Sequence, residues 1–158
     1  NPHPPRYLRN LRQVIIMDKI PSFQKNHDAL SVGLYAQTDA NGVTTFDLRM
    51  KKPNAGDYIS PKALHTVEHL MATALRNSRA KENIIYFGPM GCRTGFYLLT
   101  VRMTYEEVLA LLKESIPVAL ALDEIPGSRR EECGNYLEHD LDGAKEEPRA
   151  YLAALEKL

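Results

Sequence analysis

The chain has 158 residues, of which 20 are basic and 20 are acidic, so its formal net charge is zero. This length suffices for one domain with a substantial hydrophobic core that does not depend on disulfide bonds. The balanced charge excludes a global electrostatic field that favours nucleic acid or an anionic membrane surface, and a neutral small molecule or another protein is the expected partner.

The first 16 residues differ in composition from the rest of the chain. They contain three prolines and the basic residues Arg6, Arg9 and Arg12, but no acidic residue. We therefore expect an N-terminal extension over residues 1–16 and a folded domain over residues 17–158. No apolar stretch approaches the about 20 residues of a transmembrane helix, and no signal-peptide pattern is visible, which predicts a soluble, cytoplasmic protein.

Two alternating segments separated by a turn come next. Residues 30–37 alternate between apolar and polar side chains, as do residues 44–51, and Asn41-Gly42 lies between them. This pattern predicts a β-hairpin. Arg49 falls on the polar face of the second strand, where the residues alone favour a solvated surface arginine.

A helix is predicted over residues 60–77. It opens with a serine as the N-cap and with Pro61 at the first helical position, where the missing N–H costs nothing. Its apolar residues recur at helical spacing and form one stripe, whereas His65, Glu68 and His69 fall on the adjoining face. We therefore expect these three side chains at the edge of the core.

The rest of the chain predicts a mixture of strands and helices. The expected elements are, in order, a strand at 84–87, a turn at 88–91, a strand at 96–103, a helix opened by the capping box Thr104–Glu107, a loop at 124–134 and a helix from about Asp142. Pro117 is expected to end or kink the first of these helices, and Pro148 to interrupt the second. Hairpins and helices outside βαβ order predict one α+β domain, an antiparallel sheet covered by helices.

The segment from His65 to His69 fits the pattern H-x-x-E-H, which is typical of the inverzincin metallopeptidases. Two imidazoles four residues apart are neighbours on a helix and can bind one metal ion, although the same spacing also arises on ordinary amphipathic helices. Cys133 could supply a third, thiolate ligand from its loop and leave one coordination position open. Zinc or ferrous iron suits such a set of donors.

The other cysteine, Cys92, has two possible roles. In a reducing compartment both cysteines are expected as thiols, with a disulfide as the less favoured alternative. Cys92 follows a Gly-Pro-Met-Gly turn and precedes Arg93, so that backbone N–H groups and a cation could favour a thiolate. The residues alone nevertheless favour a small buried hydrophobe at this position.

Three separated motifs, in the same order, resemble the S-ribosylhomocysteine lyases, or LuxS proteins. They are His65-Thr66-Val67-Glu68-His69-Leu70, the segment from Gly88 to Tyr97, and Glu132-Cys133-Gly134-Asn135-Tyr136 with His139-Asp140-Leu141. The resemblance covers about residues 22–155. One departure is Tyr86, where many members of that family have aspartate.

The resemblance implies a role for each candidate residue. His65, His69 and Cys133 would hold one Fe²⁺ or Zn²⁺ per subunit, and Glu68 and Cys92 would be the acid–base pair. Ser22, His27 and Arg49 would bind the ribosyl part of the substrate across the interface of a homodimer with shared active sites.

The implied reaction is the cleavage of S-ribosylhomocysteine to homocysteine and 4,5-dihydroxy-2,3-pentanedione, the precursor of the quorum-sensing signal autoinducer-2. The same reaction would return homocysteine to the methyl cycle. Two alternatives stay open at this point, an H-x-x-E-H metallopeptidase and a non-catalytic metal or redox sensor that uses Cys92 and Cys133.

Overall fold

The computed structural model describes residues 18–158, and the expected extension over residues 1–16 lies outside them. The elements are, in order, α2 (Pro21–Gln24), β1 (Gly33–Thr38), β2 (Val43–Arg49), α3 (Pro61–Arg76), the 3₁₀ turn η1 (Lys81–Asn83), β3 (Ile84–Pro89), β4 (Gly95–Val101), α4 (Tyr105–Leu120) and α5 (Leu141–Leu155). Among these residues, no helix is long and apolar enough to cross a bilayer.

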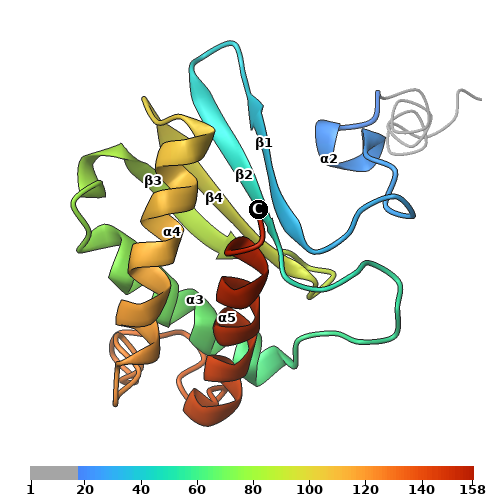
Figure 1. The fold of residues 1–158 in the computed structure, drawn as a ribbon. Coiled ribbons are helices and arrows are strands. Elements are labelled where there is room, and N and C mark those ends of the chain that lie inside the picture. Colours follow the sequence, from blue (N-terminus) through green and yellow to red (C-terminus); the bar gives the residue numbers. More distant parts are fainter. Residues whose placement is uncertain (1–17) are drawn as a thin grey trace, which may run out of the picture.

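The strands form one antiparallel sheet in the order β1-β2-β4-β3. Helices α3, α4 and α5 lie together on one face of this sheet, and the short α2 lies apart from them beside the β1–β2 hairpin (Figure 1). The predicted α+β architecture with an antiparallel sheet and helices is therefore confirmed.

The predicted hairpin forms through the turn at residues 39–42. The Asp39 carboxylate accepts hydrogen bonds from the backbone N–H groups of Asn41 and Val43, at 2.8 and 3.0 Å. Gly42 has φ of +80°, a value that a glycine adopts without a steric penalty. The register of the pair places Phe46 opposite Ala36. Successive side chains of β2 point to opposite faces of the sheet, so Phe46 and Leu48 share one face and Asp47 and Arg49 share the other.

The core lies between the sheet and the three long helices. Phe46 and Leu48 of β2 are fully buried there, as are the apolar side chains of α3 that face the sheet. Tyr151 of α5 reaches the sheet and donates its hydroxyl proton to the carbonyl of Gly33 at 2.8 Å. Burial of this phenol raises its pKa well above the ordinary value.

The two prolines that were expected to disturb helices lie inside them. Pro117 did not end α4, which runs on to Leu120. Its side chain is exposed, and α4 lacks only the one backbone hydrogen bond that the missing N–H of proline would have made. Pro148 is likewise contained within α5, whose N-cap Asp140 accepts from the N–H of Gly143.

Candidate metal centre and reactive cysteine

His65 and His69 face each other across one turn of α3. Their Nε2 atoms are 3.1 Å apart and both side chains are half-buried. The placement follows from the local sequence. The Ser60 hydroxyl caps the helix by accepting from the N–H of Ala63, and the apolar stripe then turns toward the sheet. The two imidazoles are left on the flank of the helix, as the sequence predicted.

The loop between α4 and α5 brings Cys133 to this pair. Its Sγ lies 3.5 Å from the Nε2 of His65 and 4.0 Å from the Nε2 of His69. In a tetrahedral zinc site, the usual bond lengths separate two nitrogens by about 3.3 Å and a nitrogen from a sulfur by about 3.6 Å. The three donor atoms therefore fit one metal ion.

Backbone carbonyls orient both imidazoles. The Nδ1 of His65 lies 2.7 Å from the carbonyl of Glu138, and the Nδ1 of His69 lies 2.8 Å from the carbonyl of Pro126. Because a carbonyl only accepts, each Nδ1 carries the proton and each Nε2 presents its lone pair to the shared point. This is the arrangement that outer partners impose on metal-binding histidines.

A fourth side chain in the cluster was not among the predicted site residues. His139 lies within 4.8 Å of the other donors, and its Nε2 is 3.8 Å from the Sγ of Cys133. Burial, and then the neighbouring His65 and His69, lower the pKa of His139 below 6.5. The signals in the sequence were its place in the third motif and its position six residues after Cys133. The four side chains form a His-His-Cys-His cluster whose groups could hold a metal ion.

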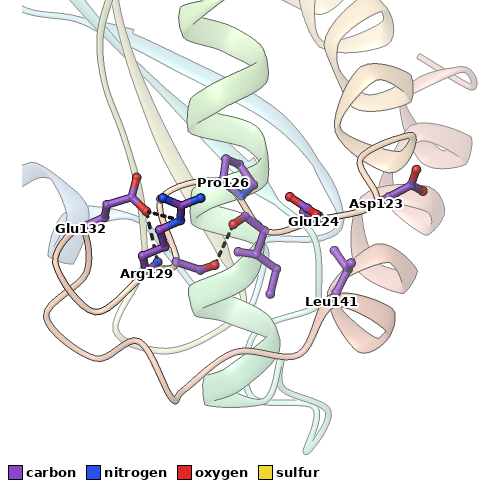
Figure 2. A pocket seen from close by; sticks show the side chains of 9 residues that line it. Asp123, Glu124, Pro126, Arg129, Glu132 and Leu141 are labelled. Atoms are coloured by element: carbon purple, nitrogen blue, oxygen red, sulfur yellow. Dashed lines mark hydrogen bonds and ion pairs between the residues drawn. The ribbon is translucent and has the colours of Figure 1, made fainter.

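Glu68 lies beside this site and not within it. It lines a hollow of about 260 Å³ together with His69, Ala72, Thr73, Pro126 and Gly127. The loop between α4 and α5 also borders a second hollow, of about 710 Å³, where Arg129 and Glu132 face one another at 3.9 Å (Figure 2). That ion pair is solvent-exposed and contributes little to stability. Glu68 is thus positioned near the cluster, with open space next to it.

Cys92 and Arg49 form a separate group at the end of the sheet. The guanidinium Nη1 of Arg49 donates to the hydroxyl of Thr94 at 2.8 Å and lies 3.9 Å from the Sγ of Cys92. The same Sγ is 3.0 Å from the Thr94 hydroxyl. Both cysteines are free. The interpretation of Cys92 as a buried hydrophobe was wrong, because its turn leaves the thiol exposed beside a cation.

The expectation of a solvated surface arginine was also wrong. Arg49 is 1% exposed and pairs with Asp47, which stands on the same face of β2. Strand alternation correctly placed Arg49 on the face of β2 opposite the core, but that face is buried at Asp47 and Arg49. Lys25, which follows α2, reaches over it and contacts the carboxylate of Asp47 at 3.2 Å. A buried arginine is tolerated because its charge is paired and hydrogen-bonded.

Ser22 lies in α2, and His27 follows that helix. Ser22 lines a hollow of about 550 Å³ between α2 and the sheet, together with Ile20, Pro21, Lys25, Gln37, Asp39, Thr45, Tyr86, Tyr97 and Leu99. His27 is held by a contact of its Nδ1 with the carbonyl of Lys25 at 2.9 Å. The candidate metal ligands thus gather between α3 and the loop after α4, whereas Arg49 and Cys92 form a separate pair.

The fold and these side chains define an α+β domain with a nitrogen- and sulfur-donor metal site and a separate exposed thiol beside a buried arginine. A family model described as S-Ribosylhomocysteinase (LuxS) matches residues 20–157. The chain belongs to this family.

Curated relatives agree with the family match. The chain is 44% identical over 150 residues to the S-ribosylhomocysteine lyase of Borreliella afzelii (strain PKo), covering 90% of this chain and 95% of the relative. It is 43% identical over 143 residues to the enzyme of the same name from Phocaeicola vulgatus, with 86% and 89% covered. A third relative, from Porphyromonas gingivalis (strain W83), is 44% identical over 144 residues, with 86% and 90% covered.

Proposed function

We propose that this chain is an S-ribosylhomocysteine lyase, which releases homocysteine and 4,5-dihydroxy-2,3-pentanedione, the precursor of autoinducer-2. Family membership and the curated relatives support this activity. The observation that carries the proposal is the convergence of the His65 and His69 Nε2 atoms on the Cys133 sulfur, in a chain that also presents a free thiol beside an arginine.

We assign His65, His69 and Cys133 as the ligands of one Fe²⁺ or Zn²⁺ ion per subunit. Imidazole and thiolate donors suit both ions, and three protein ligands leave a position for substrate. When bound, the metal would polarise the carbonyl oxygen of the sugar and ease removal of the adjacent proton. The free state of both cysteines and the need for a thiolate ligand favour the reducing cytoplasm as the site of action.

The position of the thioether explains why protons must be moved. The sulfur is attached to C5 of the sugar, whereas the aldehyde is at C1, so direct elimination has no adjacent carbanion. Two proton shifts carry the carbonyl from C1 to C2 and then to C3. Loss of the C4 proton then forms a C4–C5 double bond, breaks the C5–S bond and expels homocysteine thiolate. The enol that remains takes a proton at C5 and loses its C4 hydroxyl proton, which gives the dione.

We assign these proton transfers to Cys92 and Glu68. Each would take a proton from one carbon and return it to the next carbon or to an oxygen, a contribution of about 10² to 10⁴-fold for each group. Arg49 beside Cys92 provides a cation that favours the thiolate form of a cysteine. Glu68 has open space beside it in which a substrate proton could be reached.

The two groups of residues favour a homodimer with shared active sites. The metal-binding site lies on α3, which covers the core face of the sheet, whereas Asp47 and Arg49 alternate to the opposite face. Among residues 18–158, Cys92 has no contact with the metal-binding site of its own chain. A two-fold partner could bring its Cys92, Ser22, His27 and Arg49 to the substrate held by the metal.

The test is thiol release from S-ribosylhomocysteine by metal-replete protein, with His65→Ala as the matched inactive variant. We expect homocysteine from the wild type and none above background from the variant. Casein cleavage without thiol release would favour the metallopeptidase, and metal binding without either activity would favour the sensor. Sedimentation of the active protein tests the dimer.

A further inference from the structure

We infer that His139 is not a fourth metal ligand but a hydrogen-bond donor to the Cys133 sulfur, and that the Thr66 hydroxyl fixes the imidazole tautomer that this role requires. The inference rests on the proposed ligand set. Thr66 lies inside the H-x-x-E-H segment of α3, and His139 lies on the loop before α5. Both would act on the sulfur ligand of the metal.

Thr66 is fully buried on α3. Its Oγ1 accepts from the N–H of Asp140 at 2.9 Å and lies 2.9 Å from the Nδ1 of His139. Of these two contacts, only the one with His139 offers an acceptor for the hydroxyl proton. Because a buried hydroxyl proton needs an acceptor, it is donated to the Nδ1 of His139.

This donation fixes the tautomer of His139. A neutral imidazole has one N–H and one lone pair, so a His139 that accepts at Nδ1 carries its proton on Nε2. That Nε2–H faces the Cys133 sulfur at 3.8 Å. His65 and His69 have the opposite tautomer, since their Nδ1 atoms face carbonyls that only accept. Two of the three imidazoles therefore offer a lone pair at Nε2, and the third offers a proton.

The relative orientation of the imidazole rings also indicates that His139 is not a metal ligand. The planes of His65 and His139 are stacked, with centroids 4.0 Å apart and an interplanar angle of 23°. A bound zinc lies in the plane of each imidazole at about 2.0 Å from the nitrogen, and two nearly parallel planes do not meet that close to both rings. His65 and His69 are edge-to-face at 79°, which allows their planes to meet at one ion.

The consequence is a site with three ligands and one free position. A donor at the sulfur draws electron density from the thiolate, which leaves the metal a stronger Lewis acid than the ligand set alone would make it. The position that a fourth imidazole would close stays available to the substrate.

The test uses Co²⁺-loaded protein, in which the sulfur-to-cobalt charge-transfer band reports on Cys133. His139→Gln keeps an N–H near the position of Nε2, whereas His139→Ala removes it. We expect the Gln variant to retain the wild-type band and to bind Co²⁺ within about threefold of wild type, as measured by chelator competition. The Ala variant should shift the band to lower energy and lose about 10- to 100-fold in affinity, as is usual for a lost outer partner. Equal losses of affinity in both variants would identify His139 as a ligand.

Thr66 is tested as a positioning residue with Thr66→Ser and Thr66→Val in ¹⁵N-histidine-labelled, Zn²⁺-loaded protein. The wild type and the serine variant should show His139 protonated at Nε2 and the other two histidines of the site protonated at Nδ1. The valine variant should lose this preference. A wild-type His139 protonated at Nδ1 would overturn the inference without requiring any variant to fold. None of these measurements depends on lyase activity, and a wild type without a charge-transfer band would instead refute Cys133 as a ligand.

Discussion

Arg49 binds Asp47 through two nitrogens, with Nε 3.1 Å from Oδ1 and Nη2 2.6 Å from Oδ2, and both side chains are 1% exposed. The two residues stand two positions apart on β2. The remaining guanidinium nitrogen, Nη1, donates to the hydroxyl of Thr94 and contacts the sulfur of Cys92. It therefore connects the interior of the sheet with the exposed thiol.

The stability of this ion pair can be measured by removing one partner or both. Arg49→Met should lower the free energy of unfolding by about 3–5 kcal/mol, because it leaves the carboxylate of Asp47 largely unpaired in a buried position. The double variant Asp47→Leu/Arg49→Met should recover most of that loss, since no charge is then buried. Urea unfolding of the metal-loaded proteins measures both values. A double variant no more stable than Arg49→Met would show that the burial of charge is not the cause.

The two cysteines should separate metal binding from proton transfer. We expect Cys92→Ala to keep one metal ion per chain and to lose thiol release by at least about 10²-fold, because it removes a proton carrier but no ligand. Cys133→Ala should lose both the metal and the activity. Metal analysis and a thiol-release assay on the same preparations make the comparison, and an active Cys92→Ala protein would refute the assigned role.

Glu68→Gln gives the complementary test on α3. Glutamine keeps the size of the side chain but cannot accept and return a proton at neutral pH, so the turnover number should fall by about 10²-fold or more while metal content is unchanged. Because Glu68 lies beside the site and is not one of its four residues, loss of the metal in this variant would contradict the assignment.

Removal of the metal should loosen the loop between α4 and α5. A metal held by His65, His69 and Cys133 joins that loop to α3, and free metal at about 100 times its dissociation constant would stabilise the fold by about 2.7 kcal/mol. The chelated protein should therefore melt at a lower temperature and be cut faster by trypsin at Arg129, whose side chain is 80% exposed. His65→Ala provides the control, since added metal should protect it far less.

Alkaline pH should destabilise the fold through Tyr151. Burial raises the pKa of this phenol in the folded chain, so the native state keeps the proton while the unfolded chain releases it near pH 10. The stabilisation is complete below about pH 10 and is lost as the pH rises further, by up to about 1.4 kcal/mol per pH unit. Unfolding free energies between pH 9 and 11 should fall less steeply for Tyr151→Phe than for the wild type.

Local patterns in the sequence determined the elements and the side on which each side chain stands. Alternation along residues 44–51 placed Phe46 and Leu48 in the core and Arg49 opposite them, and the structure agrees. The helical period and the Ser60 cap likewise placed His65, Glu68 and His69 on one flank of α3. Such patterns are reliable because they depend only on the geometry of one strand or one helix.

The tertiary structure alone decided what covers each side. Arg49 and Asp47 are buried as a pair, and Lys25 after α2 contacts the carboxylate of Asp47, although the strand pattern could only indicate a polar face. The loop between α4 and α5 folds back on α3 and adds His139 to the site, through a bond to Thr66 that joins residues 73 positions apart. Contacts of this kind depend on which distant segments pack together, and no periodicity in the chain records them.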